Sequence, residues 1–199
     1  FASAMFQMSQ SMFIFNVILS AIVGRSLASE IENKSIRLYV NRIGIRKLIY
    51  GGKELALLIF SIFIDILLVI TSIAFYYAVL IHNPKVASGI FYDSNVGMEI
   101  VQIVCNCIFW LTTIFLVMLM ATKLKTLVCV GVYMILYIIM NLMSYIDGIK
   151  YLSPLHYIVV ASSNSSQIMF STILFSIYAI CVGILFTHIG IRKIEKMDL

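Results

Sequence analysis

The chain has 199 residues and a formal net charge of +5, and it is strongly apolar, with 62% hydrophobic and only 12% charged residues. Soluble globular proteins carry about 25% charged residues, so this composition excludes a soluble domain and indicates an integral membrane protein. Runs such as 128–136 lack the alternation of polar and apolar residues that β-barrel strands show. The predicted fold class is therefore all-α, a polytopic helical membrane protein.

Long uncharged stretches mark the expected membrane-spanning helices. A helical span needs roughly 20 apolar residues to cross about 30 Å of hydrocarbon. By this criterion we expect five spans, at about residues 5–24, 55–81, 100–122, 126–146 and 167–191. The stretch 151–161 begins beside a Ser-Pro pair and precedes a run of serines, so it is predicted to form a short re-entrant or interfacial segment.

Lysine and arginine set the expected orientation. They gather in three connections, 25–53, 123–125 and 192–196, which alternate with connections of little net charge. The positive-inside rule puts the basic connections and the C-terminus in the cytoplasm. Five spans would then leave Phe1 outside, so we expect a sixth, N-terminal span to be missing from this chain; a native five-span protein is the alternative.

The segment 25–53 holds seven of the fourteen basic residues. Its acids, such as Glu30, come near the start of a predicted helix and its bases, such as Arg42, near the end, an order that complements the helix dipole. An apolar stripe from Ile36 to Ile43 makes this helix amphipathic, and a turn is predicted at 41–44. Two interpretations remain open: a connector that binds anionic membrane lipid, or a coupling helix that docks on a cytosolic motor subunit.

Small residues in the first predicted span follow a spacing typical of close helix packing. Ser20, Gly24 and Ala28 recur every four residues. This pattern predicts a tight helix contact, which could include a seam between two copies of the chain.

The order of motifs in the charged segment resembles the loop after the second span in membrane subunits of the second class of ABC exporters. That family includes bacitracin-export and lantibiotic-immunity permeases. The matching residues are Glu30, Ser35-Ile36-Arg37-Leu38-Tyr39, Arg42-Ile43, Arg46 and Gly52-Lys53, with Ser153-Pro154 resembling the segment before the family's last span. The chain departs from the family where Lys34-Ser35 replaces a common Gly-Thr, and where Ile43-Gly44-Ile45-Arg46 lacks a proline.

This resemblance implies a permease in a bacterial cytoplasmic membrane that exports an amphipathic peptide, a lantibiotic or a hydrophobic drug. It implies pairing with a second copy or a sibling permease, and with two ABC ATPase subunits that bind ATP and Mg. It assigns the docking of the ATPase to Glu30, Arg37, Arg42 and Arg46. The chain itself is not expected to be an enzyme: a phosphate-binding loop would need glycine at Lys47 and Ser or Thr at Glu54.

Asp65 is the only charged residue well inside a predicted span. Intramembrane acids are costly and are functional candidates by default. Asp65 could bind a cation, couple to protons or contact a cationic cargo, or it could be a neutral or hydrogen-bonded structural residue. An ATP-driven sodium exporter is therefore an alternative function, and a non-transporting scaffold or sensor subunit is another.

No catalytic set or metal-ligand spacing occurs in the sequence, and no cofactor of its own is expected for this chain. Nucleic-acid binding is not expected either, because the basic connections of the predicted topology account for the net positive charge.

Overall fold

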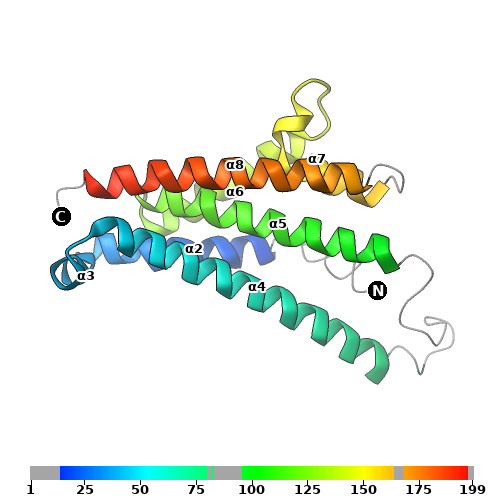
Figure 1. Ribbon diagram of the computed structural model, residues 1–199, viewed down its shortest axis with the longest axis horizontal. Helices are drawn as coiled ribbons and strands as arrows, with labels where there is room; N and C mark the ends of the chain where they lie inside the picture. The colour runs from blue at the N-terminus through cyan, green and yellow to red at the C-terminus, as the bar shows by residue number, and fades with distance from the viewer. Residues whose placement is uncertain (1–13, 80–81, 83–95, 164–167, 197–199) are drawn as a thin grey trace.

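The computed structural model describes residues 14–79, 82, 96–163 and 168–196. Every regular element in these residues is helical: α2 (Ile14–Glu32), α3 (Ile36–Ile43), α4 (Arg46–Ala78), α5 (Val96–Ala121), α6 (Thr126–Met143), η2 (Lys150–Leu152), α7 (Pro154–Ser163) and α8 (Ile168–Glu195). The long helices form an elongated bundle in which α4 runs obliquely to α5 and α8 (Figure 1). The all-helical prediction is confirmed for the described residues.

Four helical segments are long and apolar enough to cross a membrane, which is consistent with a membrane protein. They are Arg46–Ala78, Glu99–Ala121, Thr126–Met143 and Ile168–Glu195. The first predicted span, 5–24, is described only from residue 14 onward, as the start of α2. The count of five spans and a missing sixth therefore stays a prediction.

Helix α4 begins earlier than its predicted span. It starts at Arg46 rather than near Leu55 and continues unbroken to Ala78. Gly51 and Gly52 are weak helix formers, but the neighbouring side chains of Ile49 and Tyr50 are buried. Tertiary packing of this first part of the helix offsets the low propensity of the glycine pair, so the last eight residues of the predicted connector, 46–53, are continuous with the span.

The short helix α3 ends in a turn at the predicted position. Gly44 has a φ of 71° and its N–H donates to the carbonyl of Val40 at 2.8 Å. A residue without a Cβ adopts this left-handed conformation without steric cost. Ile45, in extended conformation, then leads into α4.

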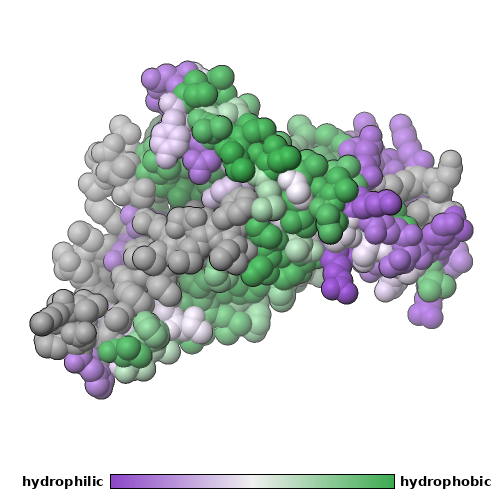
Figure 2. All heavy atoms as spheres, turned by 180° about the vertical axis from the view of Figure 1, so that it is seen from behind, coloured by the Kyte–Doolittle hydropathy of each residue, from purple (hydrophilic) through white to green (hydrophobic). Residues whose placement is uncertain are grey.

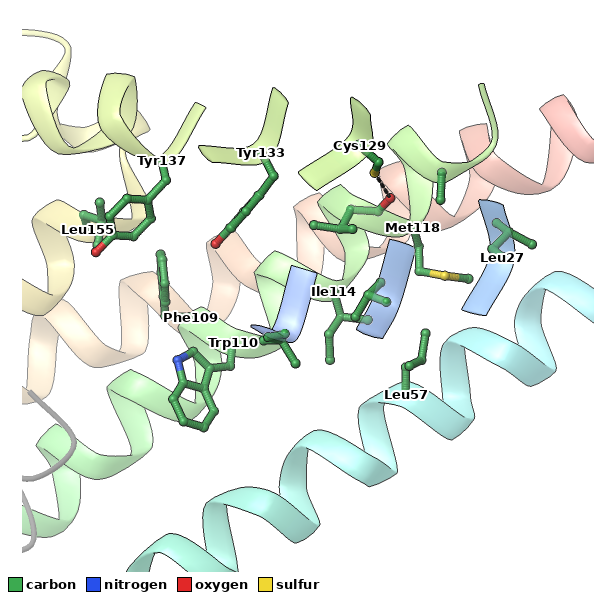
Figure 3. Packing of buried hydrophobic residues seen from close by; sticks show 14 of the residues in the cluster. Leu27, Leu57, Phe109, Trp110, Ile114, Met118, Cys129, Tyr133, Tyr137 and Leu155 are labelled. Carbon is green, nitrogen blue, oxygen red and sulfur yellow. Dashed lines mark hydrogen bonds between the residues drawn. The ribbon is translucent and has the colours of Figure 1, made fainter. Parts of the chain in front are cut away.

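Helix α5 lies at the centre of the core. Its residues Phe109, Ile114 and Met118 are almost fully buried and contact side chains from α2, α4 and α6 (Figure 3). Two buried polar groups here pair with each other: the hydroxyls of Thr113 and Tyr133 are 3.1 Å apart. Such pairing removes the cost of burying hydroxyl groups in an apolar interior.

The stripe of small residues on α2 packs inside the chain. Ser20, Gly24 and Ala28 are all buried, and a Cβ at Gly24 would lie 3.8 Å from the side chain of Cys129 on α6. The predicted close contact is therefore formed between α2 and α6, which leaves these residues no surface for a seam between two copies.

The predicted segment 151–161 is divided between η2 and α7. Pro154 takes the first position of α7, where its missing N–H costs no hydrogen bond. The hydroxyl of Ser153 donates to the carbonyl of Met140 at 2.6 Å, and the ring of Tyr157 stacks on Phe175 of α8 at 5.3 Å. These contacts fix α7 against the bundle; its depth in the membrane stays a prediction.

Candidate functional site

The three basic connections lie together at one end of the molecule. Hydrophilic side chains gather at that end, while the middle of the molecule is apolar (Figure 2). Two hydrogen bonds tie the helix ends there: Thr126 N–H donates to Glu32 Oε1 at 2.7 Å, and Arg46 Nη1 donates to the carbonyl of Glu195 at 3.2 Å. This arrangement is expected if the three connections face one side of a membrane.

At the far end of α6, the described residues carry little net charge. Lys150 Nζ lies 2.7 Å from Asp147 Oδ1, and this hydrogen bond holds the pKa of the Asp147 carboxyl below its ordinary value. Cation and anion therefore offset each other at this end.

Lys53 connects α2, α3 and α4 at the basic end. Its Nζ forms an ion pair with Glu30 Oε1 at 2.5 Å and donates to the carbonyl of Ser26 at 2.7 Å. The same ammonium lies 5.7 Å from the centre of the Tyr39 ring, within the range of a cation–π interaction. One side chain on α4 thus binds two turns of α2 and touches α3.

Helix α3 presents an unusual surface. Ile36 is fully buried and anchors the helix, whereas Leu38 is 66% exposed and Ile43 47% exposed. The basic residues Arg37 and Arg42 are exposed on the same short helix. Apolar and cationic side chains are therefore exposed together at the basic end, and we call the exposed residues of this helix, 37–39 and 41–43, the α3 surface.

The structure separates the four predicted docking residues into two pairs. Arg37 and Arg42 are exposed on the α3 surface. Glu30 is paired with Lys53, and Arg46 is half-buried and bonded to the end of α8. Glu30 and Arg46 thus position the elements around α3, and their assignment to docking stays a prediction.

The buried face of α4 is rich in polar residues. Glu54 is 4% exposed, Ser61 0%, Asp65 5% and Ser72 2%. Sequence reasoning singled out Asp65 but missed Glu54, which it placed in the charged connector. The spacing of these residues, at seven, four and seven positions along one helix, is a signal that could have found it.

Glu54 lies between α4 and α8 near the basic end. Its Oε1 accepts a hydrogen bond from the hydroxyl of Thr187 at 2.9 Å, and it is within electrostatic range of Tyr50. The Tyr50 hydroxyl is itself buried without a hydrogen-bond partner among the described residues. This region therefore combines an acid and a free hydroxyl in an apolar setting.

Asp65 lies deeper, where α4 meets α5. Its carboxylate faces Cys107, and neither of its oxygens has a hydrogen-bond partner of standard geometry among the described residues. The hydroxyl of Ser61, one turn away on the same face, is also buried without a partner there. Unsatisfied oxygens in an apolar interior are costly, which makes this place a candidate for a bound cation or proton.

A groove of about 730 Å³ runs between α4, α5 and α8. Its walls are almost wholly apolar; the polar groups that reach it are Ser176, Thr187 and His188. Thr187 belongs both to the groove and to the hydrogen bond with Glu54. The size is that of a small-molecule pocket, and we call this feature the α4–α8 groove.

Comparison with known proteins gives no relative: no protein family, curated protein or solved structure matches the chain. Among the described residues, no three His, Cys, Asp or Glu side chains come together in a way that could hold a metal ion.

Proposed function

We propose that this chain is the membrane-spanning subunit of an ATP-driven exporter and that the α3 surface docks on a separate ATPase. The observation that carries the proposal is a short amphipathic helix at the basic end that exposes Leu38 and Ile43 beside Arg37 and Arg42. Apolar anchors together with arginine are typical of protein interfaces. The motif order of this segment and its resemblance to exporter permeases support the same function.

The connections around α3 support a role in transmitting movement. The ion pair of Lys53 with Glu30 holds α2 against α4, and buried Ile36 fixes α3 to the same unit. Displacement of α3 by a closing ATPase would therefore reach α4 directly. In this proposal the basic end faces the cytoplasm of a bacterium, two ATPase subunits hold ATP and Mg, and a second permease completes the pathway for a peptide, lantibiotic or drug.

The test is ATP hydrolysis by the reconstituted complex. The chain is co-expressed with ABC ATPases from the same genome, each in turn, and placed in lipid nanodiscs. Arg42→Glu and Leu38→Asp are expected to lower complex formation and permease-stimulated hydrolysis at least about tenfold, because each puts an acid into a surface that relies on apolar and cationic contacts. Arg25→Glu is the control, since Arg25 is an exposed base of the same end on α2.

Equal losses in the Arg25 control and the α3 variants would show that net charge rather than the α3 surface matters, and would contradict the proposal. A chain that never binds an ATPase would favour the scaffold or sensor function instead.

Sodium export is a second candidate function. The observation that favours it is the group of buried oxygens on Asp65 and Ser61 without partners among the described residues. ATP hydrolysis that depends on sodium would favour this candidate over export of a peptide or drug.

A further inference from the structure

We propose that the α4–α8 groove binds a membrane-dissolved cationic amphiphile, with its hydrocarbon tail along the apolar walls and its positive head beside Glu54. The inference rests on the proposed export function in one respect: if the chain is an exporter, the bound amphiphile is its cargo. The binding site itself consists of the groove and of Glu54, which does not line the groove but is hydrogen-bonded to its wall residue Thr187.

The groove suits a hydrocarbon tail. On α8 it extends from Ser176 to Ile191, which is about 22 Å at 1.5 Å per residue. Its rim residues Ile62 and Ile184 are 48% and 67% exposed, so the groove opens sideways on the apolar surface of the bundle. A tail dissolved in the membrane could enter it without crossing water.

The floor of the groove depends on one close contact. A Cβ at Gly183 of α8 would lie 2.9 Å from the ring of Phe115 on α5, and both residues line the groove. The absence of a side chain at Gly183 lets the ring pack closely against α8. The groove is thereby kept open as a slot between the helices.

Beside the head-group end, the carboxyl of Glu54 has no cationic partner among the described residues. Glu54 has one hydrogen bond, from Thr187, and no ion pair among the described residues. The adjacent cation, Lys53, is held by Glu30 and the carbonyl of Ser26 on the α2 side. A buried carboxylate without a cation is costly, and a positively charged head group would relieve that cost.

Charge and shape decide between the possible occupants. An anionic lipid would bring like charge to Glu54, and an uncharged lipid would leave the carboxylate unpaired. A second copy of the chain would meet a slot that runs between helices rather than a flat face. A narrow tail with a cationic head matches both the apolar walls and Glu54, with the buried hydroxyl of Tyr50 beside the head group.

The experiment measures probe binding to the complete chain in phosphatidylcholine nanodiscs without any ATPase. Three nitroxide-labelled probes share one hexadecyl tail and carry an ammonium, a hydroxyl or a sulfate head. The fraction immobilised by the protein is read by electron paramagnetic resonance. The ammonium probe is expected to bind about tenfold more tightly than the hydroxyl probe, and the sulfate probe least tightly.

Two variants with matched controls assign the site. Glu54→Gln is expected to weaken the ammonium probe to the level of the hydroxyl probe, whereas Glu195→Gln, an exposed acid near the end of α8, changes nothing. Ile62→Trp is expected to weaken all three probes by filling the groove. Ile66→Trp is its control, because Ile66 is similarly exposed on α4 at 53% but does not line the groove.

Three results would overturn the inference: no preference of the wild type for the ammonium head, an undiminished preference in Glu54→Gln, or full binding to Ile62→Trp. A change in the number of chains per disc in Ile62→Trp would also overturn it, in favour of contact between copies. Because no ATPase is present, failure here leaves docking at the α3 surface untouched. If the chain binds the probes but no ATPase docks on the α3 surface, the proposed exporter function is rejected and the amphiphile site is not.

Discussion

Two carboxylates on the buried face of α4 have different surroundings. Glu54 receives a hydrogen bond from Thr187 and lies beside an apolar groove. Asp65, about three helical turns further along, faces a thiol and has no standard hydrogen bond among the described residues. The two acids are therefore suited to different partners. Glu54 suits a cationic head group, and Asp65 suits a small cation or a proton.

Replacing Asp65 tests whether its buried carboxylate lowers the stability of the protein. Asp65→Asn is expected to stabilise the chain by about 1–3 kcal/mol, because it removes an unpaired buried charge at nearly constant shape. Thermal unfolding in detergent, with and without sodium, measures this. Asp147→Asn, at an exposed acid, is the control, with a change within about 0.5 kcal/mol.

Sodium-dependent stabilisation of the wild type that disappears in Asp65→Asn would support ion binding at Asp65. A less stable Asp65→Asn protein would show that the carboxylate makes a needed bond.

Helices α4 and α8 approach each other closely where Gly190 meets Tyr50. A Cβ at Gly190 of α8 would lie 2.3 Å from the hydroxyl oxygen of Tyr50 and 2.4 Å from its ring carbon Cζ. Tyr50 is fully buried, so its ring has no open space to move into. The contact fixes the spacing of the two helices beside Glu54.

Gly190→Ala is expected to lower the stability by about 1–3 kcal/mol, since overpacking forces a helix or a buried ring to shift. Gly131→Ala on α6 is the control: nothing lies within 4 Å of its added Cβ, and alanine is the better helix former. Unfolding midpoints in detergent compare the two. Equal midpoints would mean that the α4–α8 spacing does not depend on Gly190.

In the part of the chain that the structure describes, the molecule has a basic end and a nearly neutral one. The turn at Lys123 precedes α6 and Asp147 follows it, and the eighteen residues of α6 span about 27 Å. That length is close to the hydrocarbon thickness of a bilayer. The two connections of α6 therefore suit opposite faces of a membrane.

Cysteine labelling tests this arrangement in cells. After replacement of the four native cysteines by alanine, Lys123→Cys is expected to react with an impermeant maleimide only in inside-out vesicles, and Asp147→Cys only in intact cells, because basic connections stay in the cytoplasm. Both side chains are exposed, so access to the reagent is limited by the membrane alone. Labelling of both positions from one side would contradict the proposed topology.

The uncharged runs of the sequence were sufficient to place α5, α6 and α8, because a missing charge over roughly 20 residues has few explanations besides a span. The turn at Gly44 could likewise be predicted from local chemistry. The helical spacing of Glu54 with Ser61 and Asp65 was visible in the sequence, but its hydrogen bond with Thr187 was not, because that contact depends on how α8 crosses α4. The ion pair between Glu30 and Lys53 joins residues far apart in sequence, so it too depended on tertiary packing.

The continuity of α4 has a mechanical consequence. Its 33 residues make a rod about 50 Å long, whereas the hydrocarbon core is about 30 Å thick. A rod of this length that crosses a bilayer would extend beyond it, and Gly44 and Ile45 connect the rod to α3. A tilt of about 10° would carry one end of such a rod by about 9 Å relative to the other. Helix α4 thus has the form of a lever arm, whose first turn adjoins α3 and whose residues Leu58 and Ile62 form part of one wall of the groove.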